Sequence, residues 1–156
     1  MTSIRTSSLT QRAAEPEHLA AGTAQAGWGG TDTMDNIENA SGSAFSDLII
    51  GNDDPNSIWG GGGADAINGG GDSDTFLGGD SSIDTINGGL GDDRIDGGAE
   101  GDFLHGDDGI DYITAGSGLD FVFGGAGADN LYGGSEADSI NGGNDNDFWL
   151  GGDAGI

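Results

Sequence analysis

A nine-residue repeat runs through most of this 156-residue chain and limits what the chain can fold into. A period this short predicts a solenoid, in which each unit packs on its neighbours. Only one unit, GGDSSIDTIN, has an extra residue, and we expect the insertion around Ser81 and Ser82 to form a small bulge in a turn. The twelve units begin at Gly42, Gly51, Gly60, Gly69, Gly78, Gly88, Gly97, Gly106, Ala115, Gly124, Gly133 and Gly142.

Two positions of the repeat carry nearly constant chemistry. Position six is Asp in eleven of the twelve units, and Asn56 is the exception. Position eight is always a large apolar residue, usually β-branched or aromatic, as strands favour. We therefore expect six turn residues and three strand residues per unit, with one side chain pointing inward. The expected core column is Ile49, Ile58, Ile67, Phe76, Ile86, Ile95, Leu104, Ile113, Val122, Leu131, Ile140 and Trp149.

These patterns predict an all-β fold, a right-handed parallel β-roll (β-solenoid) with two nine-residue units per coil. Successive coils should stack at about 4.8 Å, as neighbouring strands do. We expect a disordered N-terminal segment over residues 1–26 and a degenerate lead-in unit over 27–41. The β-roll itself should occupy residues 42–156 and be truncated at the C-terminus, since the chain stops inside a thirteenth unit.

The composition opposes a conventional packed core. Glycine accounts for 35 residues, and each loses much backbone freedom on folding. The net charge is −25 with only three Lys and Arg residues, so the folded chain would repel itself. Two interpretations remain, a disordered chain or a structure stabilised by bound cations. Nucleic acid is excluded as a partner because phosphates require a basic surface.

The units resemble the calcium-binding nonapeptide G-G-x-G-x-D-x-U-x of RTX, or hemolysin-type, proteins, where U is a large apolar residue. The segments GGGGADAIN (60–68), GGLGDDRID (88–96) and GGAGADNLY (124–132) match every fixed position. The resemblance implies several Ca²⁺ ions, at most about ten, between the turns of adjacent coils. Oxygen ligands in tolerant geometry suit Ca²⁺ better than Mg²⁺.

The resemblance also implies which residues hold the ions. Each ion would take Asp carboxylates from two turns and backbone carbonyls from the glycines. The implied metal ligands are Asp65, Asp74, Asp84, Asp93, Asp102, Asp111, Asp120, Asp129, Asp138 and Asp147, with Gly61, Gly63, Gly89, Gly91, Gly125 and Gly127. In the first two units Phe45 and Asp54 replace the glycine at position four, and Asn56 replaces an Asp. We expect these two units to be weak calcium sites or caps.

No catalytic motif is present, so we expect a non-enzymatic, calcium-binding repeat domain of a secreted bacterial protein whose folding calcium drives. The N-terminus lacks the apolar run of a signal peptide, which the resemblance relates to type I secretion. No stretch is long enough to span a membrane. Two alternatives stay open: a carrier or C-terminal domain of a missing secreted protease, lipase or toxin, and a structural stalk or adhesin segment.

Four ring side chains are expected to lie together on one face of the β-roll. Phe103, His105, Phe121 and Phe123 occupy outward strand positions in units two apart, which should be adjacent in space. Such a patch can mark a docking surface for a partner protein or a second copy of the chain. The alternative is ordinary strand propensity.

Overall fold

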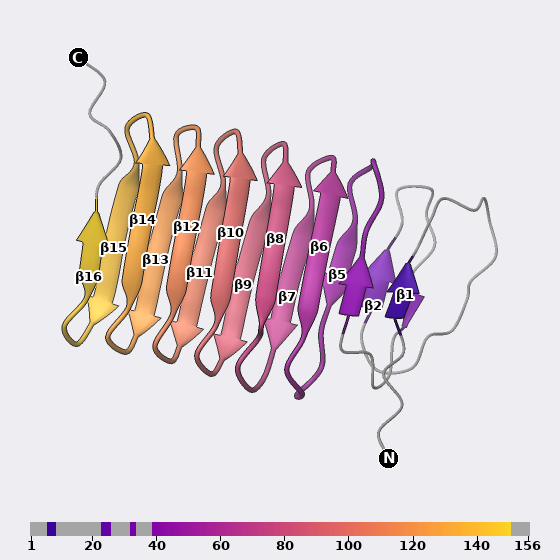
Figure 1. The fold of residues 1–156 in the computed structure, drawn as a ribbon, viewed down its shortest axis with the longest axis horizontal. Coiled ribbons are helices and arrows are strands. Elements are labelled where there is room, and N and C mark those ends of the chain that lie inside the picture. Colours follow the sequence, from indigo (N-terminus) through magenta and orange to yellow (C-terminus); the bar gives the residue numbers. More distant parts are fainter. Residues whose placement is uncertain (1–5, 9–22, 26–31, 34–38, 151–156) are drawn as a thin grey trace.

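The computed structural model describes residues 6–8, 23–25, 32–33 and 39–150. Within these residues the chain forms strands and no helix, wound into a parallel β-solenoid of about six turns (Figure 1). The expected β-roll is therefore confirmed. None of the described elements is a helix of the length and hydropathy needed to cross a membrane. The assignments made for residues 1–26 and 27–41, and for the chain end at 151–156, lie largely outside the described residues.

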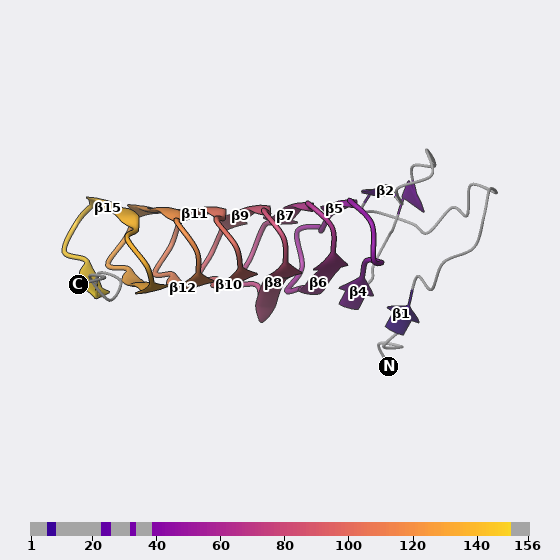
Figure 2. The same cartoon turned by 90° about the horizontal axis from the view of Figure 1, so that it is seen from above.

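The strands alternate between two eight-stranded sheets that lie over each other as two layers (Figure 2). Sheet A contains, in order, β1 (Thr6–Ser8), β4 (Asn39–Ser41), β6 (Ser57–Gly62), β8 (Phe76–Ser81), β10 (Arg94–Ala99), β12 (Tyr112–Ser117), β14 (Asn130–Ser135) and β16 (Phe148–Leu150). Sheet B contains β15 (Ser139–Asn144), β13 (Phe121–Ala126), β11 (Phe103–Asp108), β9 (Thr85–Leu90), β7 (Ala66–Gly70), β5 (Leu48–Ile50), β2 (Thr23–Gln25) and β3 (Asp32–Thr33). The pairings of β2 with β5 and with β3 are antiparallel, whereas the winding itself is parallel.

The core is a single narrow row of apolar side chains between the sheets. One apolar residue per strand points inward, with Ala115 as a second one in β12. The inward residues pair with equivalent residues in the flanking coils, as Leu104 does with Ile86 and Val122. Ile140 is only partly buried. The large, fully buried members are Ile49, Ile58, Ile67, Leu77, Ile86, Ile95, Leu104, Ile113, Val122 and Leu131. Burying one side chain of this size contributes about 1.5–3 kcal/mol to the free energy of unfolding. The sum over this single row is small for a chain so rich in glycine.

The prediction that Phe76 belongs to the core column is wrong. Leu77 fills that place, fully buried, and pairs with Ile58 and Ile95 in the adjacent strands. The backbone N–H groups of Thr75 and Phe76 both donate to the carbonyl of Asn56, at 2.8 and 3.4 Å. This sharing of one acceptor by two residues is a β-bulge at the start of β8, with Thr75 exposed.

The extra residue of the array therefore lies in this bulge and not around Ser81 and Ser82. The ten-residue unit runs from Gly69 to Gly78, and the next unit begins at Gly79. The turn that contains Ser82 has the same backbone as its neighbours, with φ of 73° at Asp80 and 84° at Ser82.

Candidate calcium sites in the turns

Each coil places its two turns at opposite edges of the solenoid (Figure 1). Position six of the repeat forms one row of side chains along each edge. One row consists of Asp47, Asp65, Asp84, Asp102, Asp120 and Asp138, and the other of Asn56, Asp74, Asp93, Asp111, Asp129 and Asp147. From Asp47 to Asp129 these side chains are buried. The fold therefore stacks two rows of carboxylates, largely out of water.

One oxygen of each carboxylate forms part of the backbone hydrogen bonding. Oδ1 of Asp93 accepts a hydrogen bond of 2.8 Å from the backbone N–H of Asp74 in the preceding coil. The equivalent bonds in the other pairs are 2.7–3.1 Å long. The pairs joined in this way are Asp65 with Asp84, Asp74 with Asp93, Asp84 with Asp102, Asp93 with Asp111, Asp102 with Asp120, Asp111 with Asp129, Asp120 with Asp138, and Asp129 with Asp147.

The second oxygen of these carboxylates is buried and has no hydrogen-bond partner among the described residues. It is the Oδ2 atom of Asp65, Asp74, Asp84, Asp93, Asp102, Asp111, Asp120, Asp129 and Asp138. A buried polar atom without a partner costs free energy, and an ionised one costs more. The nine oxygens in two rows therefore favour the binding of cations along both edges.

A backbone carbonyl from the next coil approaches six of these nine oxygens. At Gly88, a Cβ would collide with Oδ2 of Asp93 and would lie 2.7 Å from the carbonyl oxygen of Gly106. The same arrangement recurs at Gly69, Gly79, Gly97, Gly106 and Gly124. The missing side chain therefore leaves a space where oxygens from two coils converge.

This donor set fits calcium. Within the part of the chain that the structure describes, no three His, Cys, Asp or Glu side chains cluster as metal ligands. The carboxylates must therefore be complemented by backbone carbonyls, which gives an all-oxygen set. Ca²⁺ takes six to eight such oxygens, whereas transition metals favour imidazole or thiolate.

The glycines named from the sequence lie in turns with a distinctive backbone. Gly61, Gly63, Gly89, Gly91, Gly125 and Gly127 all have φ between 98° and 141°. They belong to ten turns, from the Gly60 unit onward, that have positive φ at positions two and four. Non-glycine residues also adopt it, as at Glu100 (φ 75°) and Glu136 (φ 77°). Glycine favours this backbone because a Cβ is strained there.

Burial changes the protonation of the carboxylates when no metal is bound. Desolvation, with a smaller contribution from neighbouring carboxylates, raises the pKa of Asp84, Asp93 and Asp102 to about 7. The pKa of Asp65 and of Asp111 rises to about 6 for the same reasons. The hydrogen bond that each Oδ1 accepts from a backbone N–H opposes this rise in pKa. Near neutral pH, carboxylates with these pKa values would be partly protonated in the metal-free turns.

In the first coil, both side chains at position six have hydrogen-bond partners in the protein. Oδ2 of Asp47 accepts hydrogen bonds from the N–H of Ser43, at 2.6 Å, and from its hydroxyl, at 3.0 Å. The Asn56 amide donates to Oδ1 of Asn52 at 3.1 Å, to Oδ1 of Asp74 at 3.2 Å and to the carbonyl of Asp54. Neither turn has the positive-φ pair of the later turns. The sequence pointed to Asn56 as a departure from the ligand pattern. It did not point to Ser43 and Asn52, because their role is visible only once the turns are folded.

The aromatic patch expected from the sequence is present on sheet B. Phe103 stacks on Phe121, with ring centroids 5.1 Å apart and planes within 3°. His105 stacks on Phe123 at 4.8 Å and 10°. The three Phe rings are exposed.

A model of the RTX calcium-binding nonapeptide repeat matches the chain in four copies, over residues 41–76, 78–113, 97–131 and 114–148. No curated protein matches the chain. RTX repeats bind calcium ions, and their β-roll is a structural domain that is not catalytic by itself. Since the matched residues make up more than half of the sequence, the chain belongs to the family of RTX calcium-binding nonapeptide repeat proteins.

Proposed function

We propose that calcium ions bound in the turns drive the folding of this repeat domain. The proposed ligands are the carboxylates of Asp65, Asp74, Asp84, Asp93, Asp102, Asp111, Asp120, Asp129, Asp138 and Asp147, with carbonyls of turn residues that include Gly61, Gly63, Gly89, Gly91, Gly125 and Gly127. We assign no ion to the turns 42–47 and 51–56, whose polar atoms are satisfied by Ser43, Asn52 and Asn56.

The observation that carries the proposal is the set of nine buried Oδ2 atoms without hydrogen-bond partners. Without cations, folding would bring charged carboxylates together out of water, in a chain of net charge −25. The narrow core offers little to offset this cost. Calcium supplies the missing positive charge and ligates the orphaned oxygens.

The setting that suits this behaviour is outside the cell. RTX repeats are typical of secreted proteins. At the low calcium of a cytosol the chain would stay unfolded and competent for export. Extracellular modules bind calcium at about 10⁻⁴–10⁻³ M, so the chain would fold after export. The domain would then serve as a calcium-stiffened stalk or as the carrier of an attached domain.

Circular dichroism and small-angle X-ray scattering of the full chain test the proposal. After dialysis against a chelator we expect an expanded coil, and millimolar calcium should restore a β spectrum and a compact, elongated particle. Millimolar magnesium should be much less effective, because Mg²⁺ requires a tighter octahedral site. A chain that is equally compact in chelator would refute calcium-driven folding.

We further propose that the Phe103/Phe121/Phe123 face docks a protein partner or a second copy of the chain. The supporting observation is that these stacked, exposed rings form one patch on sheet B. Replacing Phe121 and Phe123 by Ser should reduce calcium-dependent oligomerisation in sedimentation experiments. An unchanged oligomer size would contradict self-association through this patch.

A further inference from the structure

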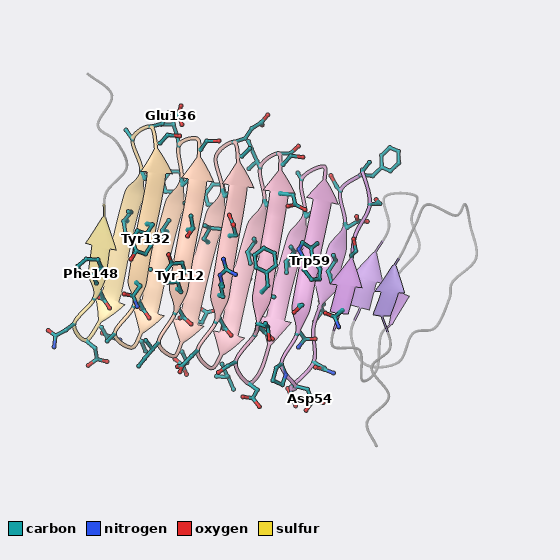
Figure 3. The ribbon with its side chains drawn as sticks, in the orientation of Figure 1. Asp54, Trp59, Tyr112, Tyr132, Glu136 and Phe148 are labelled. Carbon is teal, nitrogen blue, oxygen red and sulfur yellow. The ribbon has the colours of Figure 1, made fainter. Side chains whose placement is uncertain are left out.

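The outer face of sheet A carries one planar side chain per coil over six successive coils. We call this row the ring face, and it consists of Trp59, Phe76, Arg94, Tyr112, Tyr132 and Phe148 on β6, β8, β10, β12, β14 and β16. Figure 3 shows Trp59, Tyr112, Tyr132 and Phe148 over the same sheet, while Asp54 and Glu136 lie at the opposite turn edges. With about 4.8 Å between coils, the row is about 24 Å long.

Neighbouring members of the ring face contact each other. The rings of Trp59 and Phe76 lie 5.5 Å apart, and the guanidinium of Arg94 lies over Phe76 at 5.4 Å. The rings of Tyr112 and Tyr132 lie 5.2 Å apart. These contacts make two short platforms of planar groups along the solenoid axis, with Phe148, 56 % exposed, on the last coil. Trp59, Tyr112 and Phe148 are exposed, and Phe76 and Tyr132 are half-buried. A row of aromatic side chains of this length at the surface indicates a binding surface.

The residues between the rings are polar and the face is electrically neutral. Asp96, Thr114 and Asn130 lie at outward strand positions beside the rings. Of the acidic residues from Asp47 to Asp147, only Asp96 lies at such a position, and it shares β10 with Arg94. Asp80 lies near the end of β8 and Asp107 and Asp108 at the end of β11, next to the turns, and the other acidic residues lie in turns. The ring face therefore runs between two strongly acidic edges.

This charge pattern restricts the partner. Polyanions would be repelled by the edges, and a cationic partner would be drawn to the turns, where it would compete with calcium. Among the described outward residues of sheet A from 57 to 148, none is Leu, Ile, Val or Met, so no aliphatic cluster is present to serve as the core of a protein interface. A long, flat, neutral row of rings with hydroxyl, amide and guanidinium groups suits an extended polymer with apolar faces and many hydroxyls.

We propose that the ring face binds an extended, uncharged polysaccharide along the solenoid axis. The C–H faces of pyranose rings would stack on Trp59, Phe76, Tyr112, Tyr132 and Phe148. Sugar hydroxyls would donate to Asp96 and accept from Arg94. The proposal requires the folded solenoid and is independent of which turn residues ligate the ions.

Binding of the full chain in millimolar calcium to cellulose, chitin and soluble neutral β-glucans, with a polyuronate as the charged comparison, tests this proposal. The test variant is Trp59→Ala with Tyr112→Ala on sheet A. The control is Ile110→Ala with Leu119→Ala, which removes two exposed apolar side chains that belong neither to the ring face nor to the sheet B patch. Circular dichroism in calcium reports the fold of each variant, so a failure of calcium-driven folding is seen separately from a loss of glycan binding.

We expect the unmodified chain and the Ile110/Leu119 control to bind at least one neutral polysaccharide, and the sheet A variant to bind about tenfold or more weakly. If the double variant does not fold, Tyr112→Ala alone should still weaken binding measurably. The proposal is overturned if no neutral polysaccharide binds, if the polyuronate binds as tightly, or if both variants bind equally. It is also overturned if the sheet A variant loses self-association instead, since the occupant would then be a second copy.

Discussion

The backbone N–H of Asp65 donates a hydrogen bond of 2.7 Å to Oδ1 of Asp84 in the next coil, and Oδ2 of Asp84 has no such partner. The two oxygens of one carboxylate thus have different environments. Oδ1 joins adjacent coils by a hydrogen bond that needs no metal, and Oδ2 is left to bind a cation. A substitution that keeps the hydrogen bond at Oδ1 and removes the negative charge therefore tests whether Oδ2 binds a cation.

Asp93→Asn is such a substitution, because the Asn side chain can still accept the hydrogen bond from Asp74. We expect the midpoint of calcium-induced folding to rise by about tenfold, since the number of charged ligands sets calcium affinity. Titration followed by circular dichroism measures this midpoint. Asp108→Asn is the matched control, because Asp108 is an exposed carboxylate at position three of its turn. An equal shift in both variants would mean that only net charge matters.

The first coil should behave differently from the rest. Asn56→Ala removes the donor to Asn52, Asp54 and Asp74, which should lower the free energy of unfolding in calcium by about 1–3 kcal/mol. The number of ions bound should not change, because no ion is assigned to this turn. Isothermal titration calorimetry and thermal unfolding measure the two quantities. Loss of bound calcium in this variant would show that turn 51–56 is a metal site after all.

Acid should favour the folded state of the calcium-free chain. The ordinary pKa of Asp is 3.8, and burial raises it to about 7 at Asp84, Asp93 and Asp102 in the folded chain. Between these values the folded state binds more protons, so its stability falls as pH rises and is greatest below the ordinary pKa.

We therefore expect scattering in chelator to show a more compact chain at about pH 4.5 than at about pH 7.5. High salt at the higher pH should not reproduce this compaction, because salt screens repulsion without removing the cost of burying the charges. A calcium-free chain that is equally expanded at both values would contradict the predicted coupling.

The bulge should be dispensable. Deleting Thr75 leaves a regular nine-residue unit, so the calcium midpoint and melting temperature should change little. Deleting Tyr112 at the corresponding start of β12 is the control. It should abolish the cooperative transition, because a slip of one residue turns the core side chains outward. Similar loss of folding in both deletions would refute the placement of the insertion.

The assignment of the core residue in β8 has its own test. Leu77→Ala should destabilise the calcium-bound state by about 2–5 kcal/mol, the usual cost of emptying a buried leucine site. Phe76→Ala removes a side chain that lies over Gly78 on the outer face, and should cost clearly less. Thermal unfolding in calcium compares the two. A larger effect at Phe76 would restore the assignment made from the sequence.

The repeat predicted the winding and the rows of Asp because both follow from period and residue type. It did not locate the insertion, since Asp74 and Asp84 are equally far apart wherever the extra residue lies, and Phe76 and Leu77 are both apolar. That error also placed Phe76 in the core and hid the ring face. The separate environments of Oδ1 and Oδ2 could not be predicted, because they depend on the vertical offset of adjacent coils.

The bulge at Thr75 has a consequence for how arrays of this kind can change length. The extra residue is taken up at the start of a strand, and every later turn keeps its glycines and its aspartate in place. Unequal crossing-over between repeated gene segments, even when it adds one codon there, would therefore still encode a chain that folds.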